Sequence, residues 1–209
     1  MRVKVCGMTQ LDQVRKLDEL GVDFAGFIFY PKSPRYAARH INGQELRKAK
    51  LRIGKVGVFV NTPYEEMMRT VDEYGLDMVQ LHGDETASFC NRISDRIKVI
   101  KAFRIKDFDT NIDWLVQEYD EVCDYYLFDK GSAGLYGGTG QKFNWNLLEK
   151  SNIGKPFFLS GGICREDVAA LKNFNHPFFY GVDVNSRFET KPGIKDMALI
   201  KEFVNDLKQ

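Results

Sequence analysis

The sequence predicts an α/β fold, a single-domain (β/α)8 TIM barrel that spans residues 1–209. Eight short apolar runs recur along the chain, separated by stretches with helical spacing, which is the alternation of a parallel sheet with crossover helices. A length of 209 residues accommodates eight such units at the small end of the range for a closed barrel. The competing architecture is a doubly wound open sheet, but no Gly-x-Gly-x-x-Gly follows the first apolar run.

The composition is that of a globular protein with neither a nucleic-acid nor a membrane partner. Of the residues, 44% are hydrophobic and 28% are charged, and 30 basic against 29 acidic side chains give a net charge of +1. This balance lacks the excess of positive charge that marks nucleic-acid binding. No apolar run approaches the roughly 20 residues that span a bilayer. The chain enters a strand pattern at once, with no signal peptide.

The four cysteines lie far apart, and no Cys-x-x-Cys pair is present. This spacing indicates a reduced cytoplasmic protein rather than a disulfide framework or a zinc site. The histidines His40, His82 and His176 form no cluster in the sequence, so we expect no metal site.

The eight predicted strands are the apolar runs at residues 2–6, 23–29, 55–60, 77–81, 98–103, 124–128, 156–160 and 178–184. Apolar residues at helical spacing predict helices at 64–74, 84–95, 111–119, 144–150, 165–172 and 196–207. A further helix should begin directly after Cys6, because Thr9 and Asp12 have the spacing of a capping box, and Gly21 should end it. The residues after the second strand give the least regular pattern.

Cys6 ends the first strand on the face that points into the predicted barrel. Alternation along the strand puts Lys4 and Cys6 on this face, whereas Val3 and Val5 face the helices. A parallel barrel gathers the C-terminal ends of its strands at one mouth, which is where Cys6 should lie. The Lys4 ammonium and the N-terminus of a helix capped by Thr9 would favour the thiolate. The alternative is a buried, unreactive cysteine.

Asp129 closes the sixth strand, directly after the aromatic and apolar residues 125–128. Burial against aromatic side chains disfavours the charged carboxylate, which suits a general acid. A helix-capping or loop aspartate is an equally good interpretation. The glycine-rich segment 131–140 follows, and it could approach a ligand closely, form a mobile lid or merely connect two elements. It is no P-loop, because no Lys-Ser/Thr pair follows at the required offset.

A phosphate site is predicted in the loops after the seventh and eighth strands. Ser160-Gly161-Gly162 ends the seventh strand, and Asn185-Ser186 ends the eighth. Loops at these two positions form the recurrent phosphate site of (β/α)8 barrels, where backbone N–H groups bind the anion. Gly161, Gly162, Asn185 and Ser186 are therefore candidate phosphate ligands.

Polar residues also follow two of the earlier strands. The guanidinium of Arg35 could bind a carboxylate through two hydrogen bonds, although a solvated surface arginine is the simpler interpretation of this residue alone. Gln80 and His82 end the fourth strand, where His82 could bind a ligand or serve a structural purpose.

Taken together, these motifs resemble the phosphoribosylanthranilate isomerase family of tryptophan biosynthesis. The resemblance runs from Lys4-Val5-Cys6-Gly7-Met8-Thr9 to Lys191-Pro192-Gly193-Ile194-Lys195-Asp196. The motifs between them are Ser33-Pro34-Arg35, Gly57-Val58-Phe59-Val60, Gln80-Leu81-His82-Gly83-Asp84-Glu85, Gly137-Gly138-Thr139-Gly140, Phe143 with Trp145, and Gly161-Gly162. Each motif is short, but their joint order and spacing is specific.

The resemblance implies a cofactor-free Amadori rearrangement of a small phosphorylated substrate, N-(5-phosphoribosyl)anthranilate, into 1-(2-carboxyphenylamino)-1-deoxyribulose 5-phosphate. Asp129 would be the general acid that protonates the furanose ring oxygen and opens the ring. Cys6, as thiolate, would remove the C2′ proton. Arg35 would hold the anthranilate carboxylate, and Gln80 and Asp183 would contact the sugar or the iminium. We expect a monomer.

Two loops depart from the pattern of that family. The family usually has Ser-Ser-Gly-Val-Glu at residues 185–189, where this chain has Arg187 in place of the glycine. If φ at Arg187 must be positive, the arginine costs stability or reshapes the loop; if φ is negative, its N–H remains available and its guanidinium could add a contact. Ser160 stands where alanine is common.

Two other functions compete with the isomerase. The first is a catalytically inactive phosphosugar-binding barrel, which Arg187 motivates and the retention of Cys6 and Asp129 argues against. The second is indole-glycerol-phosphate synthase, whose reaction relies on lysines and on an extension ahead of the first strand. This chain begins one residue before its first predicted strand.

Overall fold

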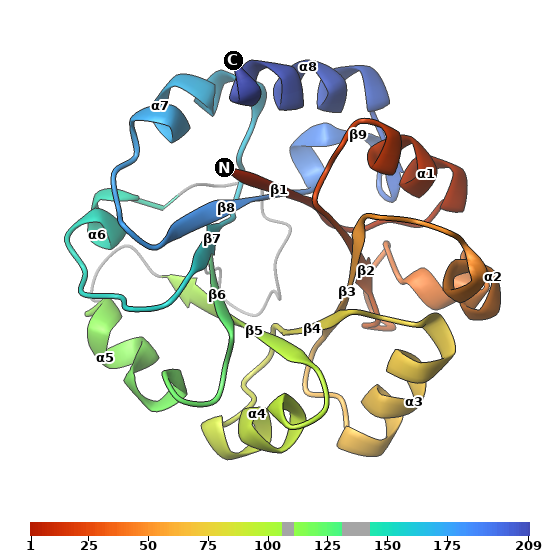
Figure 1. Cartoon of the computed structure of the whole chain (residues 1–209), viewed down its shortest axis with the longest axis horizontal. Coiled ribbons are helices and arrows are strands. Elements are labelled where there is room, and N and C mark those ends of the chain that lie inside the picture. Colours follow the sequence, from red (N-terminus) through yellow and green to blue (C-terminus); the bar gives the residue numbers. More distant parts are fainter. Residues whose placement is uncertain (106–110, 131–142) are drawn as a thin grey trace.

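A closed barrel of parallel strands forms the centre of the molecule (Figure 1). The computed structural model describes residues 1–105, 111–130 and 143–209. Neighbouring strands pair in chain order, and the first strand closes the barrel by pairing with the eighth. The strands are β1 (Arg2–Val5), β2 (Phe24–Ile28), β3 (Gly54–Phe59), β4 (Met78–Leu81), β5 (Lys98–Ile105), β6 (Tyr125–Lys130), β7 (Phe157–Leu159) and β8 (Phe179–Val184). The predicted (β/α)8 barrel is confirmed, and the open sheet is excluded.

An outer ring of helices surrounds the strands (Figure 1). The helices are α1 (Leu11–Glu19), α2 (Gly43–Lys48), α3 (Tyr64–Tyr74), α4 (Ala87–Ser94), α5 (Ile112–Val116), α6 (Asn146–Glu149), α7 (Val168–Asn173) and α8 (Met197–Lys208). Short 3-10 segments are η1 (Ala37–Arg39), η2 (Gln117–Tyr119), η3 (Arg165–Asp167) and η4 (Ser186–Phe188). The α2 helix lies in the segment whose pattern is least regular, and the Asn42 side chain caps it by accepting a hydrogen bond from Glu45 N.

The capping box predicted at Thr9 and Asp12 is wrong. Helix α1 follows Gln10, which makes no side-chain cap. The Thr9 hydroxyl instead donates to the Gly193 carbonyl at 2.5 Å, and Asp12 pairs with the exposed Arg15. A contact made by the fold therefore takes the hydroxyl that the local pattern assigns to the helix.

A two-stranded antiparallel hairpin follows β8 and η4, and the apolar pattern does not predict it. It consists of β9 (Glu189–Lys191) and β10 (Ile194–Lys195). Two hydrogen bonds join it to α1: Gln13 Nε2 donates to Lys195 O at 2.8 Å, and Lys195 N donates to Gln13 Oε1 at 3.0 Å. The hairpin is thereby held beside the start of the chain.

The barrel has an apolar layer inside and a larger core between strands and helices. The inner layer consists of Val56, Met78, Ile100, Ala102, Leu127 and Phe158. As predicted, Val3 and Val5 belong to the outer core. Lys4 is fully buried on the opposite face of β1 and meets Asp183 of β8, its register partner.

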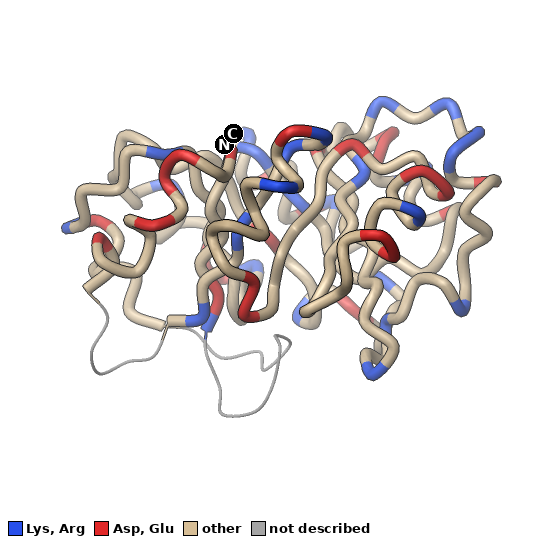
Figure 2. Tube along the Cα trace, turned by 90° about the horizontal axis from the view of Figure 1, so that it is seen from below, with Lys and Arg blue, Asp and Glu red and all other residues tan. Residues whose placement is uncertain are grey.

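Basic and acidic residues are interspersed along the chain trace, and both termini lie at the same end of the barrel (Figure 2). Within the described ranges, no helix has the length and apolar character needed to cross a membrane.

Candidate active site

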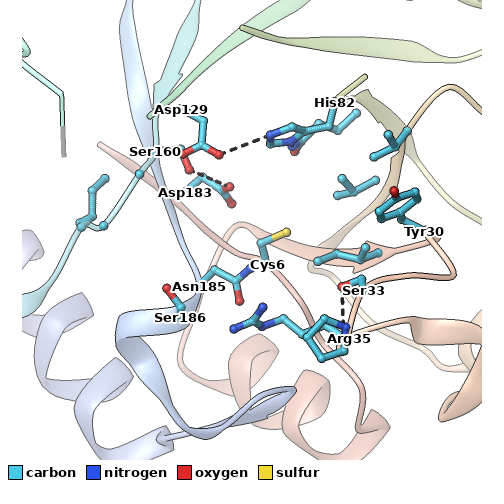
Figure 3. A pocket seen from close by; sticks show the side chains of 18 of the residues that line it. Cys6, Tyr30, Ser33, Arg35, His82, Asp129, Ser160, Asp183, Asn185 and Ser186 are labelled. Atoms are coloured by element: carbon cyan, nitrogen blue, oxygen red, sulfur yellow. Dashed lines mark hydrogen bonds and ion pairs between the residues drawn. The ribbon is translucent and has the colours of Figure 1, made fainter. Parts of the chain in front are cut away.

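One pocket lies where the barrel strands end (Figure 3). The nine residues predicted for the site all line it, namely Cys6, Arg35, Gln80, Asp129, Gly161, Gly162, Asp183, Asn185 and Ser186. Their neighbours in the lining include Tyr30, Lys32, Ser33, His82, Ser160 and Arg187. The fold thus gathers residues from loops and strands that span the whole chain, because parallel strands all end at the same mouth.

Cys6 follows β1 and directs its side chain into the pocket (Figure 3). Its N–H donates to Val184 O at 2.9 Å, which fixes the backbone against β8. The neighbouring β2 approaches so closely that a Cβ added to Gly26 would lie 2.8 Å from Cys6 Sγ and 3.0 Å from Cys6 Cα. Glycine at position 26 is therefore required for the thiol to occupy this position.

Burial raises the pKa of the Cys6 thiol, and the net shift is upward. The positive charges of Lys4 and Lys195 act in the opposite direction, whereas the negative charge of Asp183 adds to the effect of burial. The predicted influence of Lys4 is present, but it does not outweigh desolvation and Asp183. With this charge arrangement, Cys6 is a protonated thiol at neutral pH.

The Lys4 ammonium is already paired inside the barrel. Lys4 Nζ lies 2.7 Å from Asp183 Oδ1, and both side chains are buried. Burial alone would lower the pKa of Lys4, but the charge of Asp183 and the hydrogen bond to it raise the pKa above its ordinary value, so Lys4 stays cationic. Ser160 Oγ donates to Asp183 Oδ2 at 3.3 Å, which gives the serine that replaces the common alanine a partner.

Asp129 lies on β6 and lines the same pocket, near Ser160 and facing His82 (Figure 3). It is 5% exposed and caps no helix in the described part of the chain. Its Oδ1 accepts a hydrogen bond from Lys130 N at 2.8 Å. Gly161 packs directly on this carboxylate, because an added Cβ would lie 2.9 Å from Asp129 Oδ1 and 2.8 Å from Lys130 N. The position after β7 must be glycine for this contact, and its φ of +87° favours glycine as well.

His82 connects Asp129 to Gln80. His82 Nε2 lies 3.3 Å from Asp129 Oδ2, and its Nδ1 lies 2.8 Å from Gln80 Nε2. If Gln80 Nε2 donates, the imidazole carries its proton on Nε2, facing Asp129. Gln80 Oε1 is buried and has no hydrogen-bond partner among the described residues. The sequence leaves the role of His82 open, and the position at the end of β4 is the signal that identifies it as a site residue.

The loops after β7 and β8 present backbone donors to the pocket. Gly161 and Gly162 have φ values of +87° and +65°. Their N–H groups donate to no backbone carbonyl within the described ranges. In the loop after β8, Arg187 belongs to η4. Its φ is not positive, because Asn61 is the one non-glycine residue with a positive φ among those that the structure describes. Arg187 is therefore unstrained, and the alternative in which this residue costs stability through positive φ is excluded.

Arg35 is held by a carboxylate of the chain itself. Arg35 Nε lies 2.9 and 3.0 Å from the two carboxylate oxygens of Glu189, and Nη2 lies 2.7 Å from Oε2. The Arg35 side chain is only 12% exposed, so it is not a solvated surface arginine. The sequence reasoning assigns no role to Glu189 or to its partner Lys195, although both lie in segments that carry the family resemblance.

The predicted glycine-rich segment 131–140, with Gly137-Gly138-Thr139-Gly140, lies outside the described residues. Phe143 and Trp145 of the same region are described. Phe143 is buried, and Trp145 packs against the core with its indole N–H buried and without a hydrogen-bond partner among the described residues.

Comparison with known proteins identifies the family of this chain. The model of the N-(5'phosphoribosyl)anthranilate (PRA) isomerase family matches residues 3–206. The chain belongs to this family. The N-(5'-phosphoribosyl)anthranilate isomerases of Parabacteroides distasonis and Aquifex aeolicus are 41% and 38% identical to it. These alignments cover 99% and 100% of this chain and 93% and 98% of the relatives.

Solved structures agree with the sequence relatives. The phosphoribosyl anthranilate isomerase of Thermotoga maritima superimposes with a TM-score of 0.83 at 33% identity, covering 100% of this chain and 98% of that one. A phosphoribosyl anthranilate isomerase in complex with reduced 1-(o-carboxyphenylamino)-1-deoxyribulose 5-phosphate gives a TM-score of 0.80 at 33% identity, with the same coverage.

The predicted family, the enzyme class and the pathway are therefore confirmed: the chain is a PRA isomerase family member of tryptophan biosynthesis. The hypothesis that the chain is an indole-glycerol-phosphate synthase is wrong, and the hypothesis of an inactive phosphosugar-binding barrel is not favoured. The individual roles of the nine predicted residues stay predictions.

Proposed function

We propose that Cys6 and Asp129 are the base and the acid of an Amadori rearrangement that converts N-(5'-phosphoribosyl)anthranilate into 1-(2-carboxyphenylamino)-1-deoxyribulose 5-phosphate. The observation that carries the proposal is that both side chains line one pocket, Cys6 from the end of β1 and Asp129 from β6 (Figure 3). One acid and one base on opposite sides of a reacting carbon is the arrangement that a proton shift between adjacent carbons requires.

The reaction proceeds in two proton transfers by the named residues, followed by a tautomerisation. Asp129 donates its proton to the furanose ring oxygen, the bond between C1′ and this oxygen breaks, and a cationic Schiff base remains. The Cys6 thiolate then removes the C2′ proton, and the electron pair of that bond neutralises the iminium to give an enolamine. Tautomerisation adds a proton to C1′ while the 2′-hydroxyl loses one, which leaves a ketone at C2′. The proton that the Cys6 thiol releases to solvent on ionisation is balanced by the proton that Asp129 regains from solvent. No electrons leave the substrate, so the step needs no redox partner.

The raised pKa of Cys6 suits this order of events. Before ring opening, the negative charge of Asp183 opposes the thiolate. The iminium formed by ring opening is a cation, and near Asp183 it would compensate that charge and favour ionisation of the thiol. Lys4 keeps its positive charge throughout. The base would thus become available when the acidic C2′ proton appears.

The rest of the pocket supplies the binding groups. Arg35 would hold the anthranilate carboxylate, and Gln80 with its unpaired Oε1 would contact a sugar hydroxyl or the iminium. The phosphate would bind to backbone N–H groups of the loops after β7 and β8, at Gly161, Gly162, Asn185 and Ser186. Donors supplied by the backbone explain how an anionic substrate binds to a chain with a net charge of only +1.

A turnover assay with the purified chain and N-(5'-phosphoribosyl)anthranilate tests the proposal, and we expect conversion to the ketose. Binding without conversion would support the inactive phosphosugar-binding barrel instead. A crystal soaked with the reduced product analogue would test the assigned contacts. Its carboxylate should lie on Arg35, and its phosphate should lie on the loops after β7 and β8.

We further propose a monomeric, cytoplasmic enzyme. In the described part of the chain, the large hydrophobic residues that are exposed are Met1, Trp114 and Phe178, which lie in three different segments. Scattered apolar residues do not make an oligomer interface. The solved Thermotoga maritima isomerase is described as dimeric, so light scattering of the purified chain is the deciding measurement. The four cysteines are free thiols, as expected in a reducing compartment.

A further inference from the structure

We propose that Glu189 is a positioning residue, which fixes the Arg35 guanidinium so that the edge it leaves free is presented to the substrate carboxylate. The proposal rests on the proposed role of Arg35 as the carboxylate-binding group. In this proposal the carboxylate of Glu189 sets the direction of the Arg35 guanidinium, which in turn binds the carboxylate of the substrate.

The contacts between the two side chains use one edge of the guanidinium. Glu189 accepts from Arg35 Nε and Nη2, with N···O distances between 2.7 and 3.0 Å. A guanidinium has five N–H groups, so this side-on pair leaves both hydrogens of Nη1 and one of Nη2. Among the described residues, Nη1 has no hydrogen-bond partner. The free hydrogens form a second fork that matches a carboxylate.

This second fork belongs to the pocket. Arg35 lines the pocket, and Figure 3 places its guanidinium beside Asn185 and below Cys6. The aliphatic part of Arg35 also packs closely on Gly7, because a Cβ added to Gly7 would lie 2.7 Å from Arg35 Cδ. An arginine packed along its aliphatic part and hydrogen-bonded at one edge loses little freedom on binding, which is the advantage of a preorganised site.

Lys195 holds Glu189 from the other side. Lys195 Nζ lies 2.8 Å from Glu189 Oε1 and 2.8 Å from Asn185 Oδ1, and Gly193 N donates to Glu189 Oε1 at 3.1 Å. The side chain of Glu189 is 3% exposed. Burial alone would raise its pKa, but the hydrogen bond from Arg35 and the charge of Lys195 lower it below the ordinary value, so Glu189 stays ionised at neutral pH.

The charges of the three side chains sum to +1, which the substrate carboxylate can neutralise. Without Glu189, Arg35 and Lys195 would be two neighbouring buried cations that repel each other. Glutamine cannot replace glutamate here: both carboxylate oxygens accept from donors, so an amide nitrogen would face N–H groups at either position. Glu189→Gln therefore removes the negative charge and disrupts the hydrogen bonds to Arg35 and Lys195, with almost no change in side-chain volume.

Calorimetric titration of two probes tests the proposal. The first probe is reduced 1-(o-carboxyphenylamino)-1-deoxyribulose 5-phosphate, and the second is the same compound without its carboxyl group. We expect Arg35→Ala to weaken the first probe by at least about tenfold, the size expected for a lost charge-assisted pair, and the second by less than about twofold. Glu189→Gln should show the same selectivity, and the double variant should bind the first probe no more weakly than Arg35→Ala.

Each other outcome has a definite meaning. If Glu189→Gln weakened both probes equally, or its effect added in full to that of Arg35→Ala, Glu189 would act on the loop as a whole and the proposal would be wrong. If Arg35→Ala itself failed to discriminate between the probes, the assignment of the carboxylate to Arg35 would be wrong, and the role of Glu189 with it.

Two further variants keep the test interpretable. Glu189→Asp keeps the charge but shortens the reach, and it should show the same selective loss at a smaller size even if Glu189→Gln does not fold. Glu65→Gln is the matched control, because Glu65 forms an exposed ion pair with Arg92 between α3 and α4. Its binding of both probes should equal that of the unaltered chain.

Discussion

The two sides of the pocket hold their reactive groups in different ways. On the β1 and β8 side, Cys6 lies beside Lys4 and Asp183, an ion pair buried inside the barrel. On the β6 and β7 side, Asp129 lies against backbone, since Lys130 N donates to it and Gly161 packs on its carboxylate. The pKa of the thiol therefore depends on a balance of charges, whereas the position of the Asp129 carboxyl group depends on close packing.

The two sides should therefore respond to different kinds of substitution. A change of charge at constant volume should act on the thiol side, because Coulomb interactions between buried groups are weakly screened. A change of volume at constant charge should act on the acid side, because packed interiors tolerate an added methyl group poorly. The predictions below use substitutions of these two kinds.

The largest effects are expected where each side loses its reactive group. Cys6→Ala and Asp129→Asn should each lower kcat by at least about a hundredfold, the contribution typical of a general base or acid. Steady-state kinetics on the purified, folded variants gives the measurement. Near-normal kcat in either variant would show that the residue is not the acid or base of the reaction, and only the other side of the pocket would then hold a catalytic group.

Lys4→Met should destabilise the fold without altering the acid side. The substitution keeps the volume of the side chain but leaves Asp183 buried and unpaired, and breaking a buried pair in this way costs about 3–5 kcal/mol in the free energy of unfolding. Urea denaturation measures it. The matched control is Arg2→Met on the same strand, because Arg2 forms an exposed pair with Asp23 and exposed pairs contribute little. Equal losses in the two variants would contradict the importance given to the buried pair.

Gly161→Ala tests the acid side without a change of charge. The new Cβ would meet Lys130 N and Asp129 Oδ1 at less than 3.0 Å, and the backbone φ of +87° disfavours alanine as well. We expect a loss of about 1–3 kcal/mol in unfolding free energy together with a lower kcat, because Asp129 must move. Gly154→Ala is the control, since an added Cβ there meets nothing within 4 Å. An unchanged kcat in Gly161→Ala would show that the carboxylate position is not set by this contact.

The sequence predicts both sides to different depths. The inward direction of Lys4 and Cys6 follows from alternation along a strand, and the presence of Cys6 and Asp129 in one pocket follows from the common mouth of parallel strands. The barrel and the inward direction of these side chains are predictable because each strand is buried on both faces, one toward the barrel interior and one toward the helices. Such reasoning needs no knowledge of loop conformation.

The contacts that depend on loops are beyond the pattern of the sequence. Arg35 and Glu189 lie 154 positions apart and meet through a hairpin that no apolar periodicity marks. Thr9 has the local spacing of a helix cap, but its hydroxyl bonds Gly193, which lies 184 positions away. The prediction that the Cys6 thiolate is favoured fails for a related reason. Lys4 lies on the same strand and can be recognised from the sequence, whereas the opposing charge of Asp183 comes from the other end of the chain.

The smallest expected effect is a shift in the titration of Cys6, and it separates the two sides most directly. Because burial and Asp183 raise the pKa of the thiol, the thiolate should appear only above the ordinary titration range of cysteine in the unaltered chain. Asp183→Asn removes the negative charge at nearly constant volume, so the pKa of Cys6 should fall and the thiolate should appear at lower pH. The ultraviolet absorbance of the thiolate, taken as the difference between each protein and its Cys6→Ala counterpart, measures both midpoints. Gly161→Ala should leave the midpoint where it is, because it changes no charge near the sulfur. A midpoint that moved in Gly161→Ala but not in Asp183→Asn would reverse the comparison, making packing rather than charge the factor that sets the state of the thiol.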